Sequence, residues 1–169
     1  TFQTAVTALR IEALADDSLT DKGPGRAANG NFVLSEVEVE AAPLSDPSQA
    51  VPVRFVAAVA DHYQKEGDYL PSKAIDGVVD GTNGWAVEGN NRHESRTLIL
   101  APATPVGFDG GTVWRIKLRH ESQFGQHAIG RVRLAVTGDP TLAATVLGPW
   151  HSVGPFTAAD GDAAYATAF

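Results

Sequence analysis

Residues 32–41 read FVLSEVEVEA, and their side chains alternate between two kinds. One set is Val33, Ser35, Val37 and Val39, and the other is Leu34, Glu36, Glu38 and Glu40. A period of two is typical of a β-strand that has one face in the core and the other in water. We therefore expect a half-buried strand here, with Val37 and Val39 pointing inward and the three glutamates pointing outward.

Five other segments have strand character because they combine β-branched, aromatic and alternating residues. They are residues 6–15, 53–63, 95–101, 110–122 and 129–140. Polar loops rich in Gly and Pro separate them, and no segment has a strong helical period. The pattern predicts an all-β fold, an antiparallel β-sandwich. We expect residues 1–147 to form this module and residues 148–169, with WHSVGPF, to be a linker or the first strand of a following module.

The composition fits a single domain with an ordinary core, since 43% of the 169 residues are hydrophobic. A net charge of -7 argues against nucleic acid as the main partner. The chain has no cysteine, so disulfides are excluded. No stretch is long and apolar enough to suggest insertion into a membrane. The sequence does not begin with Met, and we expect it to be part of a larger protein.

The loop KAIDGVVDGTNGW, residues 73–85, concentrates oxygen atoms and turn residues. Asp76, Asp80 and Thr82 offer side-chain oxygens, and Gly77 and Gly81 allow backbone carbonyls to turn inward. Calcium takes six to eight oxygen ligands, so the loop suits this cation. The spacing does not fit an EF-hand. The alternative from the residues alone is a surface loop of Asx turns that binds no metal.

The same loop resembles the signature of galactose-binding-like, discoidin-type jelly rolls, in which A-x-DG is followed by T and W. The resemblance implies a jelly-roll sandwich with a structural Ca²⁺ held by Asp76, Asp80 and Thr82. It also implies a Glu ligand from a strand that reads like LSEVEV, which matches Glu36. In those domains this strand usually closes the domain, whereas here it precedes the loop.

Several pieces together resemble a module of planctomycete-type surface proteins that also carry cytochrome c-like domains. They are LRIEAL, GPGRAANGNFVLSEVEVEA, KAIDG, GW, FGQHAIGRVRLAVT and VGPF. By analogy of fold, such modules are taken to bind carbohydrate without catalysis. The resemblance implies a secreted, cell-surface or periplasmic multidomain protein. Its expected partners are a poly- or oligosaccharide and the adjacent modules of the same chain.

Sugar sites combine exposed aromatic rings with hydrogen-bonding groups at the rim. The candidate rings and polar groups for this role are Tyr63, Tyr69, Phe124, Asn90, Asn91, Arg92, His93 and His127. Each of them alone is also compatible with a plain surface position. Trp85 and Trp114 are expected in the core.

Two strands carry basic rows, Arg115, Lys117 and Arg119 on one and Arg131 and Arg133 on the other. If these strands pair as a hairpin, the like charges share a face and need compensation. An anionic glycan would provide it. The outward glutamates of residues 32–41 on a neighbouring strand would provide it without any ligand, and we favour that interpretation.

Nothing in the sequence indicates an enzyme. The five histidines lack zinc-ligand spacing, and no G-x-S-x-G motif or cysteine nucleophile is present. We expect a non-catalytic carbohydrate-binding module. The alternatives are a structural spacer or protein-docking module, and an enzyme whose acid and base meet only in the folded chain.

Overall fold

The computed structural model of the chain describes residues 5–142. The expected domain end at residue 147 and the WHSVGPF segment lie outside these residues. The strands, with bounds in chain order, are β1 (Ala8–Ala13), β2 (Val33–Leu34), β3 (Glu36–Pro43), β4 (Val51–Pro52), β5 (Phe55–Ala60), β6 (Trp85–Ala86), β7 (Arg96–Pro102), β8 (Thr112–Arg119) and β9 (Val132–Thr137). Two short 3₁₀ helices, η1 (Thr20–Lys22) and η2 (Pro71–Ala74), lie in the loops. No helix among the described residues is long and apolar enough to cross a membrane.

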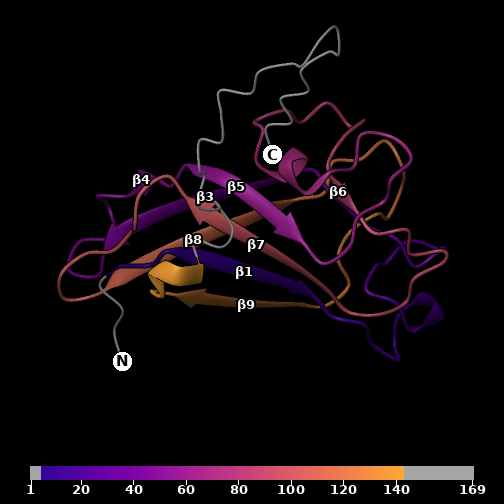
Figure 1. Ribbon diagram of the computed structural model, residues 1–169, viewed down its shortest axis with the longest axis horizontal. Helices are drawn as coiled ribbons and strands as arrows, with labels where there is room; N and C mark the ends of the chain where they lie inside the picture. Colours follow the sequence, from indigo (N-terminus) through magenta and orange to yellow (C-terminus); the bar gives the residue numbers. More distant parts are fainter. Residues whose placement is uncertain (1–4, 143–169) are drawn as a thin grey trace, which may run out of the picture.

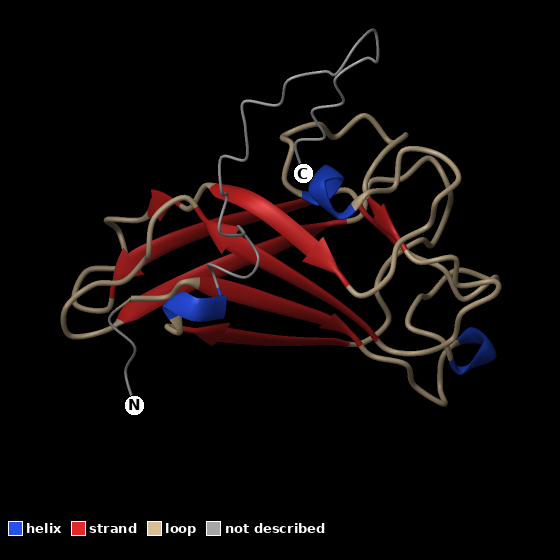
Figure 2. Ribbon diagram, viewed as in Figure 1, coloured by secondary structure: helices blue, strands red, loops and turns tan. Residues whose placement is uncertain are grey.

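The strands form two antiparallel sheets that pack face to face, as Figures 1 and 2 show. The larger sheet has the order β5-β7-β1-β9 and the smaller one the order β4-β3-β8. A separate two-stranded ladder joins β2 to β6. The expected all-β antiparallel sandwich is therefore confirmed.

The core lies between the two sheets. Its buried residues come from both of them and from the adjoining loops, and they include Leu9, Ile11, Leu98, Leu100, Val37, Val39, Phe32 and Trp85. The ring of Phe32 meets that of Trp85 edge to face, with centroids 5.0 Å apart. The Trp85 Nε1–H donates to the carbonyl oxygen of His62 at 2.9 Å. Trp85 is thus a core residue as expected, and Trp114 packs against the core from a partly buried position.

The stretch 32–41 is not one continuous strand. The chain breaks at Ser35, so that β2 pairs with β6 while β3 pairs with β8. The expected outward position is correct for Glu38 and Glu40 but wrong for Glu36, which is only 8% exposed. The reason is a long-range contact, because the backbone N–H of Gly77 donates to Glu36 Oε2 at 3.0 Å and brings the 75–77 loop over this side chain.

The hypothetical hairpin between the two basic strands is also wrong, since β8 pairs with β3 and β9 pairs with β1 in different sheets. Acids on the neighbouring strands compensate the charges. Glu38 contacts Lys117 at 3.0 Å and Arg119 at 2.7 Å. Glu12 of β1 plays the same part for Arg133 of β9. The interpretation without an anionic ligand therefore explains these rows, although Glu36 is not among the acids that contact them.

β8 and β9 are end strands of the two sheets, and no further strand among residues 5–142 pairs with the outer edge of either one. The register aligns Leu134 with Ile11 and Val136 with Leu9, so the apolar side chains of β9 face the core side. Nevertheless the exposed fractions of Val132, Leu134 and Val136 are 44%, 42% and 45%. These three residues, called the β9 apolar row below, lie at a margin that the smaller sheet covers incompletely.

Candidate functional site

The loops gather at one end of the sandwich (Figure 1). An open pocket of about 340 Å³ lies among them. Its lining residues are Asn29, Asn31, Val33, Gln64, Tyr69, Asn90, Phe124 and His127. We call this the amide pocket, because four of these side chains carry carboxamides and none belongs to Asp, Glu, Lys or Arg. Of the predicted sugar-contacting residues, the structure brings together Tyr69, Asn90, Phe124 and His127.

The carboxamides of the amide pocket are held by a hydrogen-bond network. Asn31 is 6% exposed, and its Nδ2 donates to Gln64 Oε1 at 3.1 Å while its Oδ1 accepts from the Val87 N–H at 3.2 Å. The backbone N–H of Asn31 donates to Asn29 Oδ1 at 3.1 Å. Asn29 and Asn90 are exposed. Asn31 therefore orients the site, and the exposed carboxamides are available to a solute.

Phe124 is the ring of the amide pocket that a solute can reach, since it is 47% exposed. Its centroid lies 5.4 Å from that of His127 at an interplanar angle of 46°. The His127 Nδ1 lies 3.0 Å from the carbonyl oxygen of Gly125, so it carries the proton and donates. Tyr69 is only 9% exposed and serves as a wall of the pocket rather than as a stacking surface.

The other predicted sugar-contacting residues lie elsewhere. Tyr63 packs against the main core. Asn91, Arg92 and His93 are exposed on the loop but do not line the amide pocket. A tight turn separates these residues from Asn90, because the Glu88 carbonyl accepts hydrogen bonds from the N–H groups of both Asn91 and Arg92.

Sequence reasoning missed Asn29, Asn31 and Gln64 as pocket residues. A signal for two of them was present in ANGN, residues 28–31, where asparagines flank Gly30. Gly30 adopts a positive φ of 72°, as a turn of this kind requires. Nothing near Gln64 in the sequence marks it, since it reaches the site through its long-range bond to Asn31.

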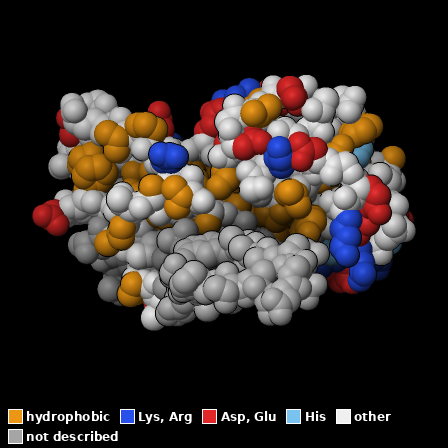
Figure 3. Space-filling model, turned by 45° about the horizontal axis from the view of Figure 1, so that its top comes forward, with side chains coloured by type: hydrophobic (Ala, Val, Ile, Leu, Met, Phe, Trp, Pro, Cys, Tyr) orange, Lys and Arg blue, Asp and Glu red, His pale blue; other side chains and the backbone are white. Residues whose placement is uncertain are grey.

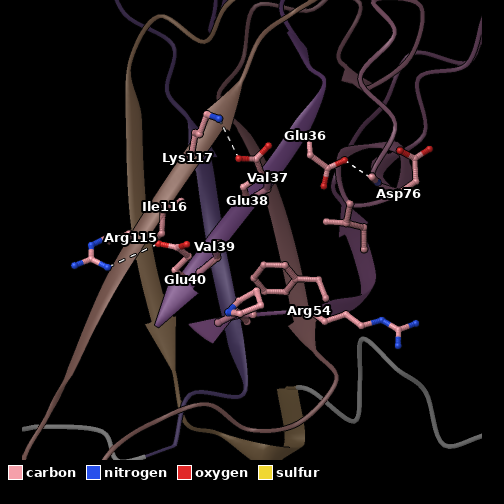
Figure 4. Close-up of a pocket in the computed structure, with 15 residues that line it drawn as sticks. Glu36, Val37, Glu38, Val39, Glu40, Arg54, Asp76, Arg115, Ile116 and Lys117 are labelled. Carbon is pink, nitrogen blue, oxygen red and sulfur yellow. Dashed lines mark hydrogen bonds and ion pairs between the residues drawn. The ribbon is translucent and has the colours of Figure 1, made fainter. Parts of the chain in front are cut away.

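At the predicted calcium loop the backbone N–H of Gly77 donates to Glu36 Oε2. Figure 4 shows Glu36 on β3 and Asp76 on the neighbouring loop. Burial raises the pKa of the Glu36 carboxyl, and the nearby charge of Asp76 raises it further, while the hydrogen bond from Gly77 opposes both effects. The Asp76 Oδ1 accepts from the Val78 N–H at 2.9 Å. A cation beside this pair of carboxylates would be stabilised by both charges.

Asp80 and Thr82, the other predicted ligands, bond to each other. The N–H and the hydroxyl of Thr82 both donate to Asp80 Oδ1, at 2.9 and 2.7 Å. These hydrogen bonds lower the pKa of Asp80. Within residues 5–142 no group of three or more His, Cys, Asp or Glu side chains is close enough to hold a metal ion. The structure thus does not gather all three predicted carboxylates.

Asn83, which sequence reasoning did not select, fits a cation at the Glu36–Asp76 pair. It is 4% exposed, and its Nδ2 donates to Asp76 Oδ2 at 3.2 Å. Its Oδ1 is buried without a hydrogen-bond partner among the described residues. Such an oxygen is costly to bury and is an ordinary ligand for calcium. The ammonium of Lys73 lies 3.6 Å from Asp76 Oδ2 and 2.9 Å from Asp68 Oδ2, which partly balances the acids.

A larger depression of about 840 Å³, the β3 groove, runs beside β3 (Figure 4). It is bounded by residues 36–40, by the corner at 52–55, by the loop at 75–77 and by residues 115–117 of β8. Most of its rim charges are paired, with Glu38 at 3.0 Å from Lys117 and Glu40 at 3.8 Å from Arg115. The space-filling view in Figure 3 shows charged and apolar side chains interspersed over the visible surface.

Comparisons with models of protein families, with curated proteins and with solved structures found no match to this chain.

Proposed function

We propose that the chain is a non-catalytic carbohydrate-binding module of galactose-binding-like, jelly-roll type. In this proposal it belongs to a multidomain protein that is secreted, on the cell surface or periplasmic. The observation that carries the proposal is the amide pocket, in which the half-exposed Phe124 ring stands among convergent carboxamides at the loop end of the sandwich. Rings beside a few placed polar groups are the usual construction of a sugar site.

The chemistry of the amide pocket suits a sugar ring. A carboxamide both donates and accepts hydrogen bonds, so Asn29, Asn90 and Gln64 can match hydroxyl groups in either sense. Phe124 can stack on the apolar face of a pyranose. The pocket is shallow and small, so we expect millimolar to micromolar dissociation constants, on the order of 4 to 8 kcal/mol.

Replacing the exposed ring tests the sugar site. Phe124→Ala should weaken binding of any sugar found on a glycan array by about tenfold, because a stacking surface is lost. Leu44→Ala is the matched control, since Leu44 is an exposed apolar residue, 51% accessible, outside the pocket. Titration calorimetry would measure both. An array without any bound glycan, or equal affinity in both variants, would contradict the proposal.

We further propose a structural Ca²⁺ held by Glu36, Asp76 and Asn83. When bound, the cation would supply charge neutralisation and fix the 73–85 loop that leads into the buried Trp85. Support comes from two neighbouring carboxylates and from Asn83, whose Nδ2 donates to Asp76 and whose buried Oδ1 has no hydrogen-bond partner among the described residues.

Thermal unfolding with EDTA and then with excess Ca²⁺ tests the cation site. A ligand at about a hundred times its dissociation constant stabilises the folded state by about 2.7 kcal/mol, so the midpoint should rise. Asp76→Asn should abolish the rise, and Asp80→Asn should keep it. Loss of the shift in both variants would restore Asp80 and Thr82 as ligands, and no shift in the unaltered chain would refute calcium binding.

The β9 apolar row favours a second candidate function, a spacer or protein-docking module. Three half-exposed aliphatic side chains in a line, on the face that points toward the core, are suited to contact with another module. In this case the partner would be an adjacent module of the same chain. The two candidates differ in their readout, because docking needs no glycan and is insensitive to Phe124→Ala.

A further inference from the structure

We propose that Glu88 is a positioning residue of the amide pocket. Through its hydrogen bond with His62 it holds the turn that carries Asn90 against the segment that carries Gln64. The inference rests on the proposed sugar binding and extends it, because Glu88 does not itself line the pocket.

Glu88 has a backbone conformation that its residue type rarely adopts. Its φ is 54°, in the left-handed region, and the positive φ falls on Glu88 rather than on the neighbouring Gly89. A residue with a Cβ atom is disfavoured there, and glycine is the usual choice. Strained positions of this kind persist where the surrounding structure holds them, and they cluster at functional sites. What a glutamate offers here, and a glycine does not, is its carboxylate.

The carboxylate of Glu88 is bonded to His62. Because a carboxylate only accepts hydrogen bonds, the Nε2–H of His62 donates to Glu88 Oε2, at 3.0 Å. The exposed fractions of the two side chains are 21% for His62 and 25% for Glu88, and a charge-assisted bond in such a partly buried place is strong. His62 is anchored in turn, since its carbonyl oxygen accepts from the Nε1–H of the buried Trp85 at 2.9 Å. Glu88 is thus tied to a residue that the core holds in place.

Each residue of this pair leads directly into a wall of the amide pocket. Gln64 follows His62 by two residues, and Asn90 follows Glu88 by two. Both Gln64 and Asn90 line the pocket. The carbonyl oxygen of Glu88 also accepts from the N–H of Asn91 at 2.8 Å, which closes the turn around Asn90. The hydrogen bond between His62 and Glu88 therefore joins the two loop segments close to the point where each presents a carboxamide.

Such a bond matters to a ligand that contacts both segments. A sugar gains more from groups that are already in place, because less conformational freedom is lost on binding. Without the Glu88 carboxylate, the turn loses its side-chain connection to His62 and the strained φ is free to relax. The carboxamide of Asn90 then moves relative to that of Gln64, and the pocket loses affinity.

Three substitutions of Glu88 in the full 169-residue chain separate positioning from stability. Glu88→Ala removes the carboxylate and keeps the strain, Glu88→Gly removes both, and Glu88→Gln keeps an oxygen that His62 can bond. Glycine tolerates the positive φ, so Glu88→Gly should have a higher midpoint of urea unfolding than Glu88→Ala. Both should nevertheless bind sugar about tenfold more weakly than the unaltered chain, and Glu88→Gln should recover most of the affinity. NMR titration with the methyl glycosides of galactose, glucose and N-acetylglucosamine measures the affinities.

His62→Ala tests whether Glu88 acts through its partner. This change should weaken sugar binding as much as Glu88→Ala, and the double variant should be no weaker than either single one. Asp21→Gly is the matched control, because it replaces another residue with a positive φ, 50°, that does not line the amide pocket. It should leave the sugar affinity unchanged.

The side-chain amide NMR signals of Asn90 and Gln64 report the positioning without any sugar. They should move in Glu88→Ala and Glu88→Gly, return toward their original places in Glu88→Gln, and stay in place in Asp21→Gly. Absence of glycoside binding by the unaltered chain would count against the sugar proposal alone, because these signals decide the role of Glu88 independently. Amide signals that do not move would overturn the inference. So would a sugar affinity that follows the urea midpoint from variant to variant, or additive losses in the double variant.

Discussion

At the scale of single residues, two glycines enclose the backbone of Asn31. A Cβ atom on Gly25 would lie 2.0 Å from the Asn31 carbonyl oxygen, and one on Gly89 would lie 2.3 Å from the Asn31 Cα. No side chain is tolerated at such distances without movement of the backbone. The two glycines therefore allow three loops to meet, and the meeting places the Asn31 carboxamide against Gln64 and Val87.

Gly89→Ala should disturb both stability and the amide pocket. The added methyl group forces backbone segments apart, and overpacking of this kind costs about 1–3 kcal/mol of unfolding free energy. Gly125→Ala is the matched control, because a Cβ there meets no heavy atom within 4 Å and its φ is not positive. Urea unfolding measures the stability, and sugar titration measures the pocket. Equal unfolding free energies and equal sugar affinities of the two variants would show that the loops can move apart without loss of stability.

At the scale of elements, β1 and β9 are joined by a charged pair as well as by their backbone ladder. Arg133 of β9 donates to both carboxylate oxygens of Glu12, each at 2.7 Å. Arg10 lies 3.4 Å from the same carboxylate. The hydrogen bonds from Arg133, followed by the charges of the two guanidinium groups, hold the pKa of Glu12 below its usual range against the opposing effect of desolvation.

Arg133→Gln should destabilise the protein near neutral pH and much less in acid. A carboxyl whose folded-state pKa is depressed contributes stability above its unfolded pKa, about 4.3, and loses it as pH falls through the folded value. Thermal unfolding of the variant and of the unaltered chain is measured at about pH 7 and about pH 3. The difference between their midpoints, the midpoint gap, should be smaller at the lower pH. Arg115→Gln is the control, because its pair with Glu40 is 3.8 Å apart and exposed. A midpoint gap that is independent of pH would contradict the stabilising role of the Glu12–Arg133 pair.

Sequence alternation located the strands well and their partners poorly. Val37 and Val39 point into the core as their period predicts, because burial of one face is a local property of a strand. The break at Ser35 and the burial of Glu36 depend on β6, β8 and the 75–77 loop, which lie far along the chain. The sequence likewise suggested that the two basic strands, β8 and β9, pair with each other. In the structure β8 pairs with β3 and β9 with β1, and both partners are acid-bearing strands from much earlier in the sequence.

At the scale of the whole molecule, the amide pocket exists only because distant loops converge. Residue chemistry pointed to Phe124, Tyr69, Asn90 and His127, since rings and amides on polar loops are recognisable in a sequence. It also pointed to Tyr63, which the fold uses in the core. Gln64, its immediate neighbour, enters the pocket instead. Adjacent side chains point in different directions in extended chain, and only the tertiary arrangement decides which of them meets a ligand.

The strands of the larger sheet bury their core-side residues to different degrees. Leu100 of β7 is fully buried beside Leu9, whereas Leu134 of β9 lies beside Ile11 and is 42% exposed. Both leucines thus lie on the same face of one sheet, but water reaches only Leu134. Hydrophobic stabilisation scales with the area removed from water, so the two leucines should differ in what they contribute.

Leu100→Ala should cost about 2–5 kcal/mol of unfolding free energy, and Leu134→Ala less than about 1 kcal/mol. The first change leaves a cavity between the sheets, while the second removes a side chain that water already reaches. Urea unfolding of the 169-residue chain measures both at equal protein concentration. A large cost at Leu134 would mean that something covers the β9 apolar row in the folded protein. If that cost also rose with protein concentration, the cover would be another copy of the chain, whereas a constant cost would place it within the chain and favour the docking function.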